Sequence, residues 1–429
     1  MATTRRNSLQ TLRHADFRKL WIADTIAILG SQIQTVAVTW QVFELTGDPL
    51  KLGMLGLFRF VPVLFFGLYG GVIADRRDRR SILILTHILL MITTGVLLVA
   101  TAMDATTLTL IYGVTFVASA VNAFAGPARQ ALIPALVPRD EIAGASTVLN
   151  LAMQTAQIGG PAFGGVIIGA AGLTAAYAIG TFSFVAVIIA ALLISVRERI
   201  VVETTNGLVA VVDGLKFLWQ TPILLSVMAI DFIATFFAAI TTLMPIFAEE
   251  ILHMGPDGLG LLLSAPAVGA VAGSLVMSAL PIPNRPGLGI VAAIVSYGLC
   301  IFAFGLSTSI WLSLLLLAGS GAADAISMAM RHAIRNLVTP PEYRGRIAAA
   351  HTTFARGGPQ LGEIRSGVMA SMFGVQAAVA IGGLATVVGC LLMARLIPGL
   401  TRYTTRPVVV HEDAAQSRTT EPVVPARRP

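Results

Sequence analysis

The chain has 429 residues, of which 55% are hydrophobic and only 12% are charged, and its mean hydropathy is +0.81. A soluble domain carries about 25% charged residues, so this composition excludes a soluble core with a solvated surface and indicates a membrane protein. The net charge of +7 does not indicate nucleic-acid binding, because the basic residues lie in short loops and tails. Such residues suit anionic lipid headgroups instead.

The sequence also lacks the usual signs of an enzyme or a metal site. Its two cysteines, Cys300 and Cys390, lie far apart inside apolar runs and are interpreted as small packing residues. It has neither a Gly-x-x-x-x-Gly-Lys-Ser/Thr loop for phosphate nor a His-Glu-x-x-His motif for zinc. We therefore expect no enzyme activity, no cofactor, no metal and no direct use of ATP.

Apolar runs long enough to cross a membrane recur along the chain. A spanning helix needs about 20 apolar residues. Twelve runs meet this need, at 20–43, 50–74, 81–102, 107–127, 142–170, 173–196, 222–249, 257–280, 287–307, 310–331, 346–372 and 375–396. The fold class predicted from them is an all-α membrane protein with twelve transmembrane helices in two six-helix bundles.

The segments between the runs divide the chain into five parts. We expect a cytoplasmic N-terminus at 1–19, bundles at 20–196 and 222–397, a central loop at 197–221 and a disordered tail at 398–429. Within the central loop, residues 206–220 could form a short amphipathic helix on the membrane surface.

The basic residues predict the orientation. With twelve spans and a cytoplasmic N-terminus, all but four of the 29 lysines and arginines fall on the inner side or in the tails. The exceptions are Lys51 on the outer side and Arg59, Arg356 and Arg365 inside spans. Because Lys and Arg concentrate in cytoplasmic loops, we expect both termini to face the cytoplasm of a cell that carries the protein in its plasma or inner membrane.

Charged residues inside spans are the first functional candidates, because they are costly in hydrocarbon. Asp24 shares a face of the first span with Ser31, Gln32 and Thr35, although it lies close enough to Lys19 to reach the interface. Arg59, near the middle of the second span, is expected to face a carboxylate or an anionic substrate.

The turn between the second and third spans concentrates charge. Four arginines and two aspartates lie between Asp75 and Arg80, directly after a glycine-rich apolar segment. So short a segment predicts a tight cytoplasmic turn. Its arginines are expected to bind acidic residues or lipid headgroups.

The fifth span contains a cluster of small residues and proline, with Gly160, Pro161, Gly164 and Gly165. Small residues allow close helix approach, and proline permits bending. This cluster predicts either a helix that rocks within the bundle or simply tight packing.

The second bundle carries three further candidate faces. Asp231, Thr235 and Thr242 share a face of the seventh span, and we expect this face and that of the first span to line one central cavity. In the tenth span Ser320, Asp324 and Arg331 form a polar stripe. Arg356, Gln360 and Glu363 share a face of the eleventh, whereas Arg365 lies roughly opposite and is expected to extend to the outer interface.

Burial raises the pKa of a carboxyl group, so a buried acid can exchange a proton near neutral pH. We therefore regard Asp324, Asp231, Asp24 and Glu363 as candidates for proton coupling, with the first two preferred. The alternative for each is a structural ion pair. Glu363 could equally belong to a gate.

The two bundles repeat one another weakly. The segment from Arg129 to Pro138 resembles the segment from Arg331 to Pro340, and Asn122 and Asp324 each precede the matching arginine by seven residues. Parallel six-helix repeats around a central cavity are typical of transporters.

Several of these features resemble the major facilitator superfamily. The sequence Gly71-x-x-Ala-Asp75-Arg76-x-x-Arg79-Arg80 resembles the loop of that superfamily between helices two and three, although Asp78 replaces a usual glycine. The cluster from Gly160 to Gly165 resembles the fifth-helix signature of its antiporters. Residues 214–219 and 127–134 are similar to the drug/proton antiporter branch that includes enterobactin-type siderophore exporters, macrolide efflux proteins and Tap-like pumps.

The resemblance implies a monomeric secondary transporter that exports amphipathic organic molecules in exchange for protons by alternating access, with membrane lipids as its other partners. A specific siderophore or metabolite exporter is the main alternative. A proton-coupled importer, a lipid flippase or a non-transporting receptor of the same fold stays open.

The loop motif leads to a first prediction. By resemblance, Asp75 accepts hydrogen bonds from the start of the eleventh helix and holds the cytoplasmic side closed. The substitution Asp75→Asn is therefore expected to reduce transport by reconstituted protein while membrane insertion stays intact. Unaltered transport would reduce the loop to a topological signal.

Overall fold

In the computed structural model, residues 8–76, 78–194, 216–279, 283–340 and 343–402 are described, without the side chains of 8–9, 68–76, 344–346, 348–356, 398 and 402. The first part contains η1 (Ser8–Arg13), α1 (Ala15–Thr46), α2 (Pro49–Arg76), α3 (Arg79–Ala102), α4 (Leu108–Leu136), η2 (Arg139–Glu141) and α5 (Ile142–Leu193). The second contains α7 (Pro222–Phe237), η3 (Thr241–Leu243), α8 (Met244–Ile246), η4 (Phe247–Ile251), α9 (Gly255–Ala279), α10 (Pro286–Gly305), α11 (Ile310–Val338), α12 (Arg344–Phe373), α13 (Val375–Leu396) and α14 (Pro398–Arg402).

These elements reproduce the twelve predicted spans. Ten helical segments of the described chain are long and apolar enough to cross a membrane. One of them holds two spans, because α5 bends at Gly172, whose φ of 78° favours glycine. The more polar α12 supplies the twelfth span, and Gly374 makes the corresponding turn, with φ of 86°, between α12 and α13.

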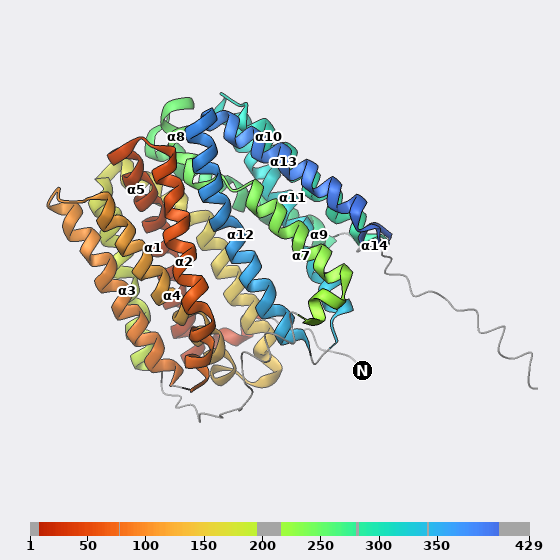
Figure 1. The fold of residues 1–429 in the computed structure, drawn as a ribbon. Coiled ribbons are helices and arrows are strands. Elements are labelled where there is room, and N and C mark those ends of the chain that lie inside the picture. The colour runs from red at the N-terminus through yellow and green to blue at the C-terminus, as the bar shows by residue number, and fades with distance from the viewer. Residues whose placement is uncertain (1–7, 77, 195–215, 280–282, 341–342, 403–429) are drawn as a thin grey trace, which may run out of the picture.

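The helices form two halves, α1 to α5 and α7 to α13, which lie on the left and right of Figure 1. We call the end that carries η1, the α2–α3 turn and α14 the basal end. The opposite end, with the α1–α2 turn and η4, is the distal end. Helices α2 and α12 lie side by side at the distal end and diverge toward the basal end (Figure 1).

Apolar packing between the halves is concentrated distally. Among the described residues, the largest cluster of buried apolar side chains joins both halves through distal residues such as Val42, Leu52, Leu243 and Phe247. The other four clusters each draw on one half. The halves are thus sealed together at the distal end.

Glycines allow the two halves to approach each other closely at the distal end, along the contact that we call the distal seam. A Cβ on Gly260 of α9 would lie 2.7 Å from the Pro161 carbonyl oxygen and 3.1 Å from the Gly165 Cα in α5. On the other side of the molecule, a Cβ on Gly367 of α12 would lie 2.8 Å from the Gly53 Cα in α2. The halves therefore touch backbone to backbone along both edges.

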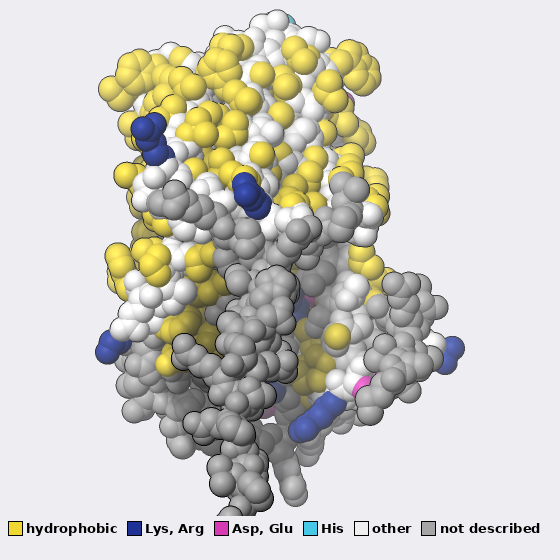
Figure 2. All heavy atoms as spheres, turned by 90° about the vertical axis from the view of Figure 1, so that its right-hand side faces the viewer, with side chains coloured by type: hydrophobic (Ala, Val, Ile, Leu, Met, Phe, Trp, Pro, Cys, Tyr) yellow, Lys and Arg dark blue, Asp and Glu magenta, His cyan; other side chains and the backbone are white. Residues whose placement is uncertain are grey.

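The outer surface of the bundle is apolar. Large hydrophobic side chains such as Phe65, Phe182, Trp311 and Leu315 are more than 60% exposed. Figure 2 shows hydrophobic side chains spread over the upper, distal part of one face, with few charged ones among them. In water such a surface would drive aggregation, so it indicates a lipid-facing belt.

The basal turn between α2 and α3 is held by hydrogen bonds to helix ends. Asp78 caps α3, since its carboxylate accepts from the Ser81 backbone N–H at 3.1 Å and from the Ser81 hydroxyl at 2.5 Å. Burial alone would raise the pKa of the Asp78 carboxyl, but these bonds together with the nearby Arg80 charge hold the pKa below its usual range. Asp78 therefore has a structural role as the N-cap of α3.

Two arginines of the turn bind backbone carbonyls. Arg79 donates to the Ala131 carbonyl of α4 at 2.9 Å and Arg80 donates to the Leu192 carbonyl of α5 at 2.8 Å. Leu192 lies in the last turn of α5, where carbonyls lack helical partners and cations are favoured. These carbonyls are partners that the sequence did not indicate, and the binding of acids or headgroups by the turn's arginines stays a prediction. The side chains of Gly71, Asp75 and Arg76 lie outside the described residues.

The tail differs from its prediction at its start. Residues 398–402 form the short helix α14 rather than a disordered segment, because Leu400 is 1% exposed against the start of α10. The surface helix proposed for 206–220 lies mostly outside the described residues.

The role of the distal seam in holding the two halves together can be tested by placing a larger side chain in it. In Gly260→Leu the new side chain meets backbone, which cannot yield, so overpacking is expected to cost the distal-closed state about 1–3 kcal/mol. Spin labels on Ala105 and Thr308, exposed at the distal ends of the two halves in a variant without Cys300 and Cys390, report their separation by pulsed electron resonance.

A longer label distance is expected in Gly260→Leu than in the parent. The matched control is Gly113→Leu, where a Cβ meets nothing within 4 Å. An unchanged distance in folded Gly260→Leu protein would show that this seam does not set the distance between the halves.

Candidate functional site

A cavity of about 850 Å³ opens among the helices of the first half and is bounded on the second by α12. Its distal wall belongs to the apolar cluster that seals the halves, through Val38, Leu97 and Val114. Its polar lining consists of Asp24, Ser31, Gln32, Gln34, Thr35, Arg59, His87, Thr94, Thr115, Ser119, Asn122, Arg129, Gln157 and Gln360. This size suits a drug-sized molecule.

Asp24 of α1 and Arg129 of α4 form an ion pair at the edge of this cavity. One terminal nitrogen of Arg129 lies 3.0 Å from each of the two Asp24 carboxylate oxygens. The carboxylate side chain is 8% exposed and that of Arg129 is 23% exposed. A carboxylate so deep is stabilised by its partner, and Asp24 does not extend to the interface.

The second half repeats this pair with an addition. Arg331 of α11 bonds through one nitrogen to Asp231 of α7 and through the other to Asp324 of its own helix at 3.1 Å. The side chains of Arg331 and Asp231 are 4% and 10% exposed, whereas that of Asp324 is 38% exposed. The structure thus brings together both preferred proton-coupling candidates on one guanidinium.

Arg59 and Glu363 connect the two halves. A terminal nitrogen of Arg59 in α2 lies 3.6 Å from a carboxylate oxygen of Glu363 in α12. That oxygen and the amide oxygen of Gln360, one turn away, are buried without a hydrogen bond in the described part of the chain. The Arg356 side chain lies outside the described residues. This seam therefore holds polar groups whose bonding is incomplete.

The seventh span is broken, which the sequence did not predict. The helix stops at Phe237 and resumes as η3 at Thr241. Arg365 of α12 donates to the Phe237 carbonyl oxygen at 2.7 Å and lies over the Phe236 and Phe237 rings. The expected extension of Arg365 to the outer interface is wrong, because its guanidinium satisfies a carbonyl at this break.

Three predicted lining residues of the second half do not line the cavity. Thr235 bonds to the backbone of its own helix at Asp231, Thr242 is fully buried beyond the break, and Ser320 bonds to the Leu317 carbonyl. The expectation that the first and seventh spans line one cavity therefore does not hold for Thr235 and Thr242. The break in the seventh span and its close packing on α12 direct these two side chains into the second half.

The glycine–proline cluster of α5 packs against two helices. A Cβ on Gly160 would lie 2.4 Å from Gln32 Cβ of α1, and one on Gly164 would lie 3.2 Å from Val36 Cβ. A Cβ on Gly165 would lie 2.5 Å from the Pro256 carbonyl oxygen of α9, in the other half. Pro161 lies between these contacts. The cluster thus serves close packing at the point where the halves meet.

Sequence reasoning missed several lining residues of α3, α4 and α5, above all His87. This residue is 7% exposed although it lies only eight residues from the basal start of α3. The helical spacing of Ser119, Asn122 and Arg129 along α4 could have indicated a polar face there.

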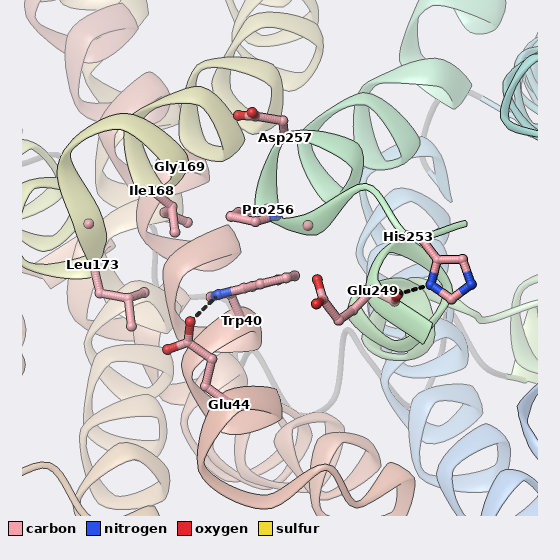
Figure 3. Close-up of a pocket in the computed structure, with 11 residues that line it drawn as sticks. Trp40, Glu44, Ile168, Gly169, Leu173, Glu249, His253, Pro256 and Asp257 are labelled. Carbon is pink, nitrogen blue, oxygen red and sulfur yellow. Dashed lines mark hydrogen bonds between the residues drawn. The ribbon is translucent and has the colours of Figure 1, made fainter. Parts of the chain in front are cut away.

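A second hollow lies between the halves at the distal end (Figure 3). It measures about 670 Å³ and is lined by Trp40 and Glu44 from α1 and by Glu249, His253 and Asp257 from the second half. The Trp40 indole N–H donates to Glu44 at 2.6 Å, and its ring lies between Glu44 and Glu249 (Figure 3). Trp40 is 4% exposed and belongs to the apolar cluster that joins the halves at the distal end.

The buried pair of the first half gives a stability prediction. In Arg129→Met the Asp24 carboxylate loses its partner, which is expected to cost about 3–5 kcal/mol of unfolding free energy. Adding Asp24→Asn removes the unpaired charge and is expected to recover most of the loss. Denaturation in detergent measures both.

The control is Arg139→Met, because Arg139 is exposed in the loop after α4. A single variant as stable as the parent, or a double variant no better than the single one, would contradict this role for the pair.

Comparisons with known proteins agree with this architecture. The family model described as transmembrane secretion effector matches residues 6–411. Among relatives, the enterobactin exporter EntS of Citrobacter koseri is 26% identical over 401 residues, covering 92% of this chain and 95% of that protein. The enterobactin exporter EntS of Salmonella typhi is 25% identical over 401 residues, with the same coverage.

Solved transporters share the fold. An inward-facing, occupied bacterial homologue of the human lysosomal transporter Spinster aligns with a TM-score of 0.70 and 15% identity, covering 91% of this chain and 97% of that one. A D-xylose–proton symporter aligns with a TM-score of 0.69 and 13% identity, covering 91% and 100%. The chain is therefore a multi-pass membrane transporter with the twelve-helix major facilitator fold, and it belongs to the transmembrane secretion effector family.

Proposed function

We propose that this transporter exports a small amphipathic organic molecule from the cytoplasm in exchange for protons. The main observation is that a cavity lined by both polar and apolar side chains in the first half accompanies a cluster of two carboxylates and one arginine in the other half. Export is supported by the relatives, which are named as exporters. The basal end would face the cytoplasm, because the arginines of the α2–α3 turn lie there.

Asp324 is the group we assign to proton coupling. The two halves carry equivalent Asp–Arg pairs, but Asp324 stands where the first half has Asn122. Arg331 already bonds Asp231, so Asp324 shares a guanidinium with another carboxylate. Two carboxylates that share one site do not both ionise easily. Because Asp324 is also the most exposed of the three side chains, it can exchange a proton with water.

The mechanism then follows from alternating access. In the present arrangement the distal seam is closed, so cargo enters from the basal side. Protonation of Asp324 would free Arg331 to pair with Asp231 alone, and loss of the proton would restore the shared arrangement. Since α7 and α11 contribute these groups and α7 packs on α12, a change in this cluster reaches the seam between the halves.

The lining favours particular cargo. Against the single Asp24 carboxylate, Arg59 and Arg129 give the described lining a net positive charge, which would disfavour a lipophilic cation. Amides and hydroxyls such as Gln32, Gln157 and Ser119 can bind neutral or anionic groups. This observation supports the second candidate function, a specific siderophore or metabolite exporter. The names of the relatives point the same way.

Reconstitution tests the proposal. In vesicles with an acidic lumen, wild-type protein is expected to accumulate radiolabelled chloramphenicol, an uncharged molecule with hydroxyl and amide groups, more than the cationic dye ethidium. Asp324→Asn is expected to lose at least about 90% of this gradient-driven uptake, because the equivalent position of the other half is naturally Asn.

The control is Asp104→Asn, a change in a distal loop at a φ of 52° that asparagine tolerates. Full uptake by Asp324→Asn would assign coupling to another group. If wild-type protein accumulates neither compound, proton-driven export of amphipathic drugs is contradicted.

A further inference from the structure

The cavity of the first half contains a buried imidazole that none of the ion pairs uses. His87 lies on α3, is 7% exposed and lines the cavity together with Asp24 and Arg129. Its ring packs edge-on against Phe184 with centroids 6.0 Å apart. Histidine is costly to bury without a bonding role, so the bonding of its two nitrogens indicates what it does.

One ring nitrogen of His87 already makes a hydrogen bond within the protein. Nδ1 lies 2.8 Å from the Leu83 carbonyl oxygen, one turn earlier in the same helix. Because a carbonyl oxygen can only accept, Nδ1 must carry the hydrogen, and in the neutral ring Nε2 is then an acceptor. Nε2 makes no hydrogen bond with the described part of the chain. The structure thus presents a fixed, unused acceptor at the cavity.

The neighbouring arginine supplies the complementary groups. Arg129 uses one terminal nitrogen for both Asp24 oxygens, so within the described chain its other terminal nitrogen and Nε keep unused N–H donors. Asn122 and Ser119 precede Arg129 on the same face of α4 and line the same cavity. A ligand that bonds both sets must carry a hydrogen-bond donor and an acceptor oxygen.

We propose that this part of the cavity is a subsite for a hydroxyl-bearing organic molecule, whose O–H donates to His87 Nε2 while an oxygen accepts from Arg129. The inference rests on the proposed transport function and names the chemistry of its cargo. His87 acts here as a binding residue with no part in proton coupling. Leu83, Leu90 and Phe184 provide the apolar wall for the carbon skeleton.

Calorimetric titration of the full chain in detergent tests this without any proton gradient. The probes are the three hydroxybenzoate isomers and their methoxybenzoate counterparts, which keep the carboxylate but lack the O–H donor. At least one hydroxy isomer is expected to bind about 3- to 10-fold more tightly than its methyl ether, as one neutral hydrogen bond warrants.

Two substitutions separate the ring nitrogens. In His87→Asn the amide takes the place of Nδ1 and the acceptor at the Nε2 position is lost, so the preference for hydroxybenzoate is expected to vanish. In His87→Gln the amide reaches the Nε2 position, so part of the preference is expected to remain. His253→Asn, a change at an exposed distal histidine, is the control.

Equal binding of hydroxy and methoxy probes by wild-type protein would overturn the proposal, and so would saturable binding of none of them. A preference that survives in folded His87→Asn would do the same. If His87→Asn does not fold, ¹⁵N-histidine resonances of the wild type decide, since the Nε2 signal of His87 must shift with the hydroxy probe. Because no gradient is used, failure of proton-driven uptake leaves this result intact.

Discussion

The structure depends on one arrangement used twice, an aspartate on the first helix of each half bonded to an arginine on the fourth. Neither charge could stay in a low-dielectric bundle alone, because an isolated buried ion costs several kcal/mol. Paired, Asp24 with Arg129 and Asp231 with Arg331 hold helices that meet otherwise through apolar contacts. Each half is therefore a body with its own internal polar link. Because the pairs lie within the halves, separating the halves at the distal seam breaks neither.

The two halves repeat this aspartate–arginine pair but differ at one position near it. Asn122 and Asp324 occupy equivalent places seven residues before their arginines, yet one is neutral and the other ionisable. In the first half Arg129 lines the cavity, and one terminal nitrogen and Nε keep N–H donors that no described residue uses. In the second half the same donor capacity is consumed by a further carboxylate. One duplicated scaffold thereby carries an ion pair beside the cavity in one half and a cluster of two carboxylates on one guanidinium in the other.

Much of the fold could be predicted from the sequence, because each spanning helix must be a long apolar run and the runs are separated by short basic loops. The residues inside the spans could also be selected, since ionisable groups in hydrocarbon are rare. The bonding partners of these ionisable residues could not be predicted. Whether Asp231 faces the cavity or Arg331 depends on helix rotation, and the break after Phe237, which turns Thr242 away, follows from a carbonyl satisfied by Arg365 far along the chain.

His87 could not be selected from the sequence for a related reason. A lone histidine in an apolar run has no pattern that distinguishes a packing role from a binding role. The distal seam finally shows why these local bonds can serve a moving protein. Gly165 with Gly260 and Gly53 with Gly367 bring backbones into contact without hydrogen-bonding side chains of their own. Such contacts depend on shape and dispersion, which fall off within about an ångström. A small tilt of one half therefore releases these glycine contacts together, whereas the Arg59–Glu363 pair and the hydrogen bond from the Ser264 hydroxyl to the Ile158 carbonyl are polar links between the halves that the same tilt must stretch or break. If Asp324 takes up the proton as proposed, that protonation must supply the cost of breaking these links.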